Sequence, residues 1–165
     1  MATTGRQRGN DIGATGVRFG NRVREVRQHL GMTQDQLSAE LDQIGRPIPK
    51  ASIGRIESGD RRVDIDDLMA LAYALNVSPL SLLLPFPNTP YVAVSLLENG
   101  TEIPAEDAWL WGLGVSPHFM RNKNHDEAAR AAERQQFQEM SKPWWLDVQA
   151  DFSADLRASR QIRDR

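Results

Sequence analysis

The chain has 165 residues, of which 40% are hydrophobic and 25% charged, and its 20 Lys and Arg against 22 Asp and Glu give a net charge of −2. This is the composition of an ordinary globular protein, and the length excludes large enzyme architectures such as the eight-stranded α/β barrel. The chain shows neither the ~20 consecutive apolar residues of a bilayer span nor an apolar N-terminal signal, so we expect a cytoplasmic protein with no membrane partner. It has no cysteine, which excludes disulfides, thiol catalysis and zinc fingers.

The charges are distributed unevenly along the chain. Residues 1–63 carry a net charge of +4, residues 64–120 carry −7 without a single Lys or Arg, and residues 121–165 carry +1. This asymmetry indicates a basic face that attracts phosphate and a separate acidic region, although charge that merely keeps the protein soluble would give a similar count.

The first segment, residues 1–16, holds four glycines and almost no apolar residue, so we expect a flexible N-terminal arm. Five short helices are then predicted over residues 17–85. The first helix carries apolar residues at helical spacing, namely Phe19, Val23, Val26 and Leu30, and Gly31 is its expected C-terminal cap.

Capping signals mark the next helices. Thr33 and Gln36 form a capping box at the start of the second helix, which ends at Gly45. The third helix is very short, contains Ile53 and Ile56, and ends at Gly59.

The fourth helix starts near Asp64 or Asp66 and stops at Asn76, a residue that tolerates a left-handed backbone. Ser78 and Pro79 have the expected order for the start of a fifth helix. A proline-containing linker is predicted over residues 86–90.

Residues 91–165 are predicted to form a separate C-terminal region for dimerisation or regulation. Alternation over residues 91–96, followed by the turn signal Asn99-Gly100 and residues 101–103, predicts a β-hairpin that needs a helix or a second copy of the protein for support. Helices are expected over residues 104–113 and 126–140. A last hydrophobic cluster is expected from Trp144, Trp145, Phe152 and Leu156.

Three motifs connect the first half to a known family. They are GMTQDQL at residues 31–37, SIGRIESGDRR at 52–62 and DLMALAYALNVSPLSLL at 67–83. With these motifs, residues 17–84, about 40% of the chain, resemble the Cro/CI-type (XRE family) DNA-binding domain. The resemblance implies a five-helix Cro/CI-like helix-turn-helix domain over residues 17–85. Together with the elements predicted after it, the expected fold class is mainly α, with this domain followed by a small α+β C-terminal region that contains a β-hairpin.

The resemblance also implies DNA-contacting residues. In such domains the third helix enters the major groove, and the first turn of the second helix faces a phosphate, which Gln34 would bind. The residues expected to read bases are Lys50, Ala51, Ser52 and Arg55, on the side opposite Ile53 and Ile56. Lysine and arginine suit guanine, serine suits several acceptors, and alanine suits a thymine methyl group.

Phosphate contacts are also expected from the loops that flank the third helix. Arg61 and Arg62 follow Gly59, where the DNA backbone should run. The turn before this helix, GRPIPK at residues 45–50, is several residues longer than usual in the family, so Lys50 lies either on the helix or in the loop. Arg46 in this turn is a further candidate for phosphate binding, while Arg18, Arg22 and Arg24 are secondary candidates.

A structural role is expected for one charged pair. By the resemblance, Glu57 pairs with Arg27 and fixes the third helix to the first. Deleting either partner would leave an uncompensated charge.

The sequence therefore predicts a sequence-specific regulator of transcription, a repressor that binds an inverted repeat in double-stranded DNA as a homodimer. The C-terminal region leaves room for a protein partner or a small effector. No enzymatic activity, metal or cofactor is expected, because no two histidines have ligand spacing. The alternatives are an antitoxin that also regulates its own operon and a protein-interaction adaptor that no longer touches DNA.

Overall fold

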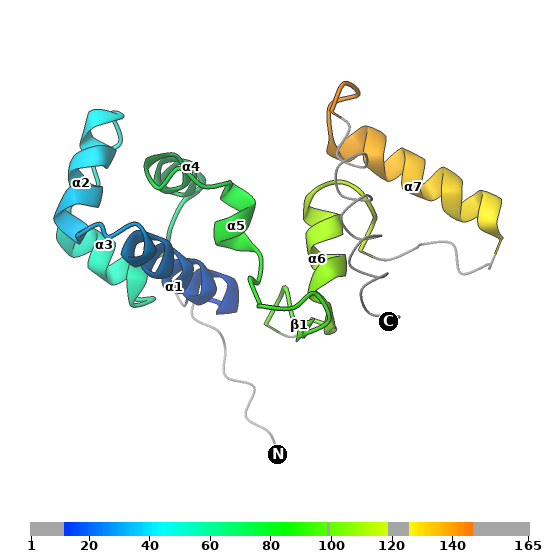
Figure 1. The fold of residues 1–165 in the computed structure, drawn as a ribbon, viewed down its shortest axis with the longest axis horizontal. Helices are drawn as coiled ribbons and strands as arrows, with labels where there is room; N and C mark the ends of the chain where they lie inside the picture. Colours follow the sequence, from blue (N-terminus) through cyan, green and yellow to red (C-terminus); the bar gives the residue numbers. More distant parts are fainter. Residues whose placement is uncertain (1–11, 99, 119–125, 147–165) are drawn as a thin grey trace, which may run out of the picture. The chain divides into compact units, whose positions relative to one another are not determined.

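The computed structural model describes residues 12–98, 100–118 and 126–146 (Figure 1). These residues divide into two compact units. One is made of residues 12–86 with 95–98 and 100–102, and the other of residues 87–94 with 103–118 and 126–146. The first unit contains five helices: α1 (Ala14–His29), α2 (Gln34–Gln43), α3 (Lys50–Glu57), α4 (Ile65–Ala74) and α5 (Pro79–Leu83). The second contains β1 (Ala93–Val94), β2 (Ile103–Pro104), α6 (Ala105–Gly112) and α7 (Glu127–Ser141).

The five predicted helices of the first unit are confirmed, and local capping chemistry explains their ends. Thr33 and Gln36 exchange the two hydrogen bonds of a capping box at the start of α2. Gly31 and Asn76 adopt left-handed backbone angles, with φ of 66° and 52°. The helix α1 begins at Ala14, inside the segment expected to be an arm, and residues 1–11 of that segment lie outside the described residues.

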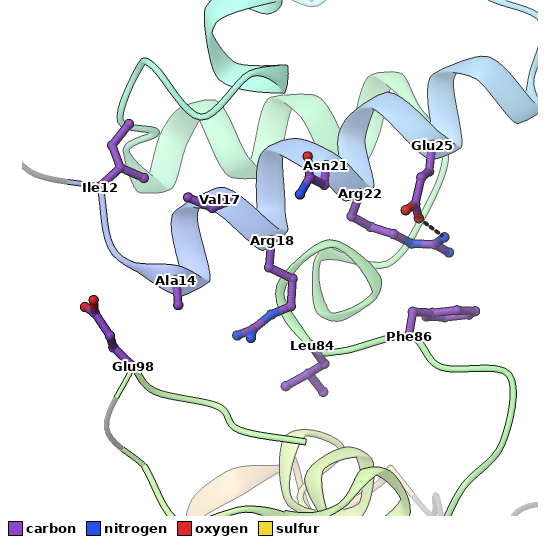
Figure 2. Close-up of a pocket in the computed structure, with 10 residues that line it drawn as sticks. All are labelled: Ile12, Ala14, Val17, Arg18, Asn21, Arg22, Glu25, Leu84, Phe86 and Glu98. Carbon is purple, nitrogen blue, oxygen red and sulfur yellow. Dashed lines mark hydrogen bonds and ion pairs between the residues drawn. The ribbon is translucent and has the colours of Figure 1, made fainter. Parts of the chain in front are cut away.

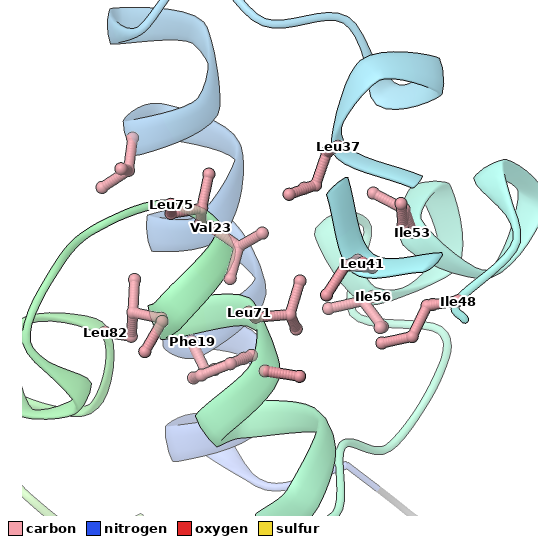
Figure 3. Packing of buried hydrophobic residues seen from close by; sticks show 13 residues of the cluster. Phe19, Val23, Leu37, Leu41, Ile48, Ile53, Ile56, Leu71, Leu75 and Leu82 are labelled. Atoms are coloured by element: carbon pink, nitrogen blue, oxygen red, sulfur yellow. The ribbon is translucent and has the colours of Figure 1, made fainter. Parts of the chain in front are cut away.

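The core of the first unit lies where all five helices meet (Figure 3). Its fully buried side chains include Val23, Leu37, Leu41, Ile53, Ile56, Leu71, Leu75 and Leu82. Ile48 joins this core from the long turn before α3 and is only 2% exposed. The Ser38 hydroxyl also donates a hydrogen bond to the Ile48 carbonyl, 2.8 Å away. The turn is therefore anchored in the core, which sequence analysis did not identify.

The helices α1 and α3 approach each other closely at Gly20. A Cβ atom placed on Gly20 would lie 2.0 Å from the backbone oxygen of Ile56, which is far inside van der Waals contact. Only glycine therefore allows α1 to meet the end of α3 at this distance.

The second unit differs from expectation in its strands. The antiparallel pair has only two residue pairs, Ala93 with Pro104 and Val94 with Ile103, so the hairpin is shorter than predicted. Residues 95–98 and 100–102, between the two strands, belong to the first unit rather than to the predicted C-terminal region. Asn99 of the expected turn lies outside the described residues.

Helices α6 and α7 confirm the two helices predicted for this region. Ala105 and Ala108 of α6 are buried, but α7 has no buried residue. The predicted hydrophobic cluster is wrong for its described members, because Trp144 is 96% and Trp145 67% exposed. Phe152 and Leu156 lie outside the described residues. Within the described ranges, none of the helices combines the length and apolar character needed to cross a bilayer.

Gly20→Ala should lower stability, because the new methyl group would force α1 and α3 apart. Overpacking of this kind costs about 1 to 3 kcal/mol or more in unfolding free energy, measurable by urea denaturation. Gly54→Ala is the matched control, because its methyl group would lie 3.7 Å from the Gln34 amide, an ordinary contact. The control should be neutral or stabilising, since alanine favours helix over glycine by up to ~1 kcal/mol. Equal stability of the two variants would contradict the close approach at Gly20.

Candidate nucleic-acid interface

A bidentate ion pair fixes the C-terminal end of α3. Arg27 of α1 donates from Nε to Oε1 of Glu57 at 2.6 Å and from its terminal nitrogen to Oε2 at 2.9 Å. Both residues are buried, with Glu57 2% exposed. Gln34 of α2 donates a third hydrogen bond to Oε2, at 2.8 Å. The carboxylate of Glu57 therefore holds α1, α2 and α3 together at one point.

The electrostatics of Glu57 favour its charged form. Burial raises the pKa of its carboxyl, but hydrogen bonds from Arg27 and Gln34 and the charges of Arg27 and Arg24 outweigh burial, so the pKa lies below its ordinary value. The hydrogen bond to Glu57 likewise raises the pKa of Arg27. Arg24 adds a backbone contact, donating to the carbonyl oxygen of Glu57.

The surface of α3 opposite its buried isoleucines carries the residues predicted to read bases. Lys50, Ala51 and Arg55 are exposed, and Ser52 is half-buried. Pro49 occupies the N-cap, so Lys50 is the first residue of the helix. Lys50 therefore lies on the helix and not in the loop, the two positions that the long turn had left open. The helix therefore presents all four predicted residues, whose role in binding remains a prediction.

Two of these side chains make contacts within the protein. Lys50 Nζ lies 2.6 Å from the Asp35 carboxylate, and both side chains are more than half exposed. Arg55 donates to the backbone oxygen of Asp60 at 3.3 Å. Exposed pairs of this kind contribute only about 0 to 1 kcal/mol, so both cations can exchange these partners at little cost.

The residues predicted to bind phosphate differ from one another in their surroundings. Gln34 lies in the first turn of α2, as expected, but its amide already donates to Glu57 and packs over Gly54. Arg62 is exposed in the loop after α3. Arg46 and Arg61 both contact the carboxylate of Asp67, a buried residue of α4.

Sequence analysis missed Asp67 because its position gives no sign of burial. It is one of several acidic residues near the start of α4, where carboxylates commonly interact with the helix N-terminus. Its partners come from loops on both sides of α3, and residue spacing along the chain does not reveal that they meet.

A groove of about 570 Å³ runs along α1 within the first unit (Figure 2). Arg18 lines it and donates to the backbone oxygens of Leu83, Ser95 and Leu96. Burial lowers the pKa of Arg18. Arg22 lies 3.1 Å from Glu25 and over the ring of Phe86. These intramolecular contacts give Arg18 and Arg22 structural roles in the first unit.

Glu57→Gln should destabilise the protein, because it keeps the shape of the side chain but leaves buried Arg27 without a counter-charge. Loss of one partner from a buried pair costs about 3 to 5 kcal/mol of unfolding free energy at pH 7. The pKa of Glu57 is lower in the folded state than in the unfolded state. The charged carboxylate therefore stabilises the folded protein fully at a pH above the unfolded-state pKa, and this stabilisation is lost as the pH falls through the folded-state pKa. The difference between wild type and variant should therefore shrink on acidification.

Glu25→Gln is the matched control for this experiment. Glu25 makes the same kind of contact with an arginine, but its side chain is 62% exposed. Its loss should change the unfolding free energy by less than about 1 kcal/mol. If both glutamine variants are equally stable in denaturant titrations, the proposed contribution of the buried pair is wrong.

Comparison with known proteins gives a family for the first unit. Residues 23–82 match the family described as Helix-turn-helix. The solved structure of the restriction-modification controller protein C.AhdI from Aeromonas hydrophila is 32% identical to this chain, and the similarity covers 40% of this chain and 92% of that chain with a TM-score of 0.36. The search of curated proteins found no match. The match identifies residues 23–82 as a helix-turn-helix domain of the XRE type, the DNA-binding domain of a family of transcriptional regulators.

Proposed function

We propose that the protein is a sequence-specific repressor that inserts α3 into the major groove of double-stranded DNA. The observation that carries this proposal is the division of α3 into two faces. Ile53 and Ile56 are buried, while the opposite face exposes Lys50, Ala51 and Arg55. The Arg27–Glu57 pair fixes the helix behind this face. A short helix with a fixed orientation and a polar outer face has the form required for base reading.

The side chains on the outer face match the chemistry of base edges. Arg55 and Lys50 can donate to O6 and N7 of guanine, and Ala51 can contact a thymine methyl group. Ser52 can either donate or accept a hydrogen bond. Gly54 adds no side chain, so direct readout by α3 is limited to a few bases.

Phosphate contacts are proposed for Gln34, Arg61 and Arg62. The start of α2 supplies backbone N–H groups that favour an anion, and Gln34 is its first residue. Arg61 and Arg62 follow the C-terminal end of α3 and are half-buried and exposed, respectively. Contacts of this kind orient the protein without reading sequence.

A dimer on an inverted repeat is proposed because one short helix distinguishes too few base pairs to select a genomic site. The second unit supports this proposal with exposed apolar side chains at Met140, Trp144 and Trp145. A groove of about 530 Å³ lies beside α7 and is lined by residues that include Trp111 and Phe137. Exposed apolar surface of this kind is typical of a protein-binding site. Repression needs only occupancy of a promoter, which a bound dimer provides.

Arg55→Ala should abolish preference for one base pair of the operator. The operator would be selected from random duplexes with the wild-type protein, and affinities would be measured by fluorescence anisotropy. Removal of a bidentate hydrogen-bond pair should reduce discrimination by about 1 to 3 kcal/mol. Arg62→Ala, in contrast, should weaken binding to all duplexes and reduce the slope of log K against log salt by about 0.9 for each phosphate that is no longer neutralised. An unchanged base preference in Arg55→Ala would overturn the proposed orientation of α3.

Sedimentation of the full chain at tens of micromolar should give a homodimer, both free and on an inverted-repeat duplex. A monomer in both conditions would refute the dimer. Co-purification of a small toxic protein, with the chain dimerising only in that complex, would instead favour the antitoxin alternative.

A further inference from the structure

One buried carboxylate connects the two loops that flank α3. The residue is Asp67, whose side chain is 4% exposed. Its Oδ1 accepts a hydrogen bond from Nε of Arg46, which precedes α3, at 2.9 Å. Its Oδ2 accepts one from Arg61, which follows α3, at 3.0 Å. The two oxygens of a single side chain thus bind one arginine on each side of the helix.

The surroundings of Arg46 are unfavourable for phosphate binding. Its terminal nitrogen lies 3.0 and 3.1 Å from the two carboxylate oxygens of Asp64, and Asp66 lies 3.8 Å from its other terminal nitrogen. One guanidinium group therefore faces three carboxylates. Two arginines, Arg46 and Arg61, and three aspartates give this cluster a net charge of −1. A phosphate approaching Arg46 would be repelled by the excess negative charge.

Arg61 differs from Arg46 in its charge surroundings. Its terminal nitrogen binds Asp67, and its side chain is 32% exposed. Its backbone N–H donates to the carbonyl of Arg55 at 3.0 Å, which places Arg61 directly at the end of α3. Because Asp67 also binds Arg46, Arg61 has no carboxylate of its own among the described residues.

The turn before α3 is held at a second point close to Arg46. Ile48 is buried in the core, and its carbonyl accepts a hydrogen bond from Ser38. Pro49, the N-cap of α3, directly follows Ile48. The contact of Arg46 with Asp67 and the burial of Ile48 therefore hold the turn at two points shortly before the first residue of α3.

We propose that Asp67 is a positioning residue for DNA recognition, which sets the start of α3 through Arg46 and directs Arg61 toward phosphate. Arg46 itself belongs to this structural link and does not contact DNA. The inference rests on the proposed function, because it assigns a specificity role to a residue that does not touch the DNA.

The test compares four variants of the full chain on the selected operator, at a temperature where each is folded. The operator preference is the ratio of the affinity for the operator to the affinity for an operator with one changed base pair. Asp67→Asn and Arg46→Gln should each lower this ratio at least tenfold. Arg46→Gln should leave the salt slope unchanged, whereas Arg61→Gln should reduce it by about 0.9 for each phosphate that is no longer neutralised. Asp107→Asn is the control and should leave both readouts unchanged, because Asp107 is an exposed aspartate in the first turn of α6 and belongs to none of these contacts.

The readouts separate positioning from simple stabilisation. If Asp67→Asn lowers the melting temperature but retains the operator preference of the folded protein, the positioning role is refuted. A drop of about 0.9 in the salt slope of Arg46→Gln, with its preference intact, would identify Arg46 as a phosphate-binding residue and also overturn the inference.

Failure of the proposed function would be recognised separately. In that case the wild-type protein would show no operator preference at all. The link would then be judged by double-mutant cycles of urea unfolding that combine Asp67→Asn with Arg46→Gln and with Arg61→Gln. Coupling in both cycles would support the link, and purely additive effects would overturn it.

Discussion

The structure of the DNA-binding unit depends on how an eight-residue helix is held in one orientation. A helix as short as α3 is not stable in water by itself, so its orientation comes from tertiary contacts. Three contacts provide it: the buried pair of Glu57 with Arg27, the packing of Ile53 and Ile56 in the core, and the close approach at Gly20. Because these contacts lie behind the helix, its outer face is left for a partner.

Several of the basic side chains in residues 1–63 are already paired with carboxylates within the protein. Arg27 is neutralised by Glu57, and Arg46 by the aspartates at the start of α4. Arg22 and Lys50 also have carboxylate partners, although these lie at the exposed surface. Buried pairs hold the fold, whereas exposed pairs can exchange their partner for a phosphate or a base. The burial and the number of the carboxylate partners therefore distinguish Arg27 and Arg46 from Lys50, whose one partner is exposed.

The second unit is organised differently from the first. Its two-residue strands bury little surface, and α7 buries none of its side chains, while aromatic residues after α7 are exposed. Two short strands are not stable without further support, and α6 packs against both of them. The exposed aromatic side chains of this unit contrast with the closed core of the DNA-binding unit.

Sequence alone determined the helices of the first unit, because helix starts and ends depend on neighbours within a few residues. The capping box at Thr33 and the left-handed position of Asn76 are local features of this kind. Tertiary structure decided the contacts of Asp67, the burial of Ile48 and the short length of the hairpin. Each depends on groups that are distant in sequence, and no periodicity or cap in the chain shows which of them will meet.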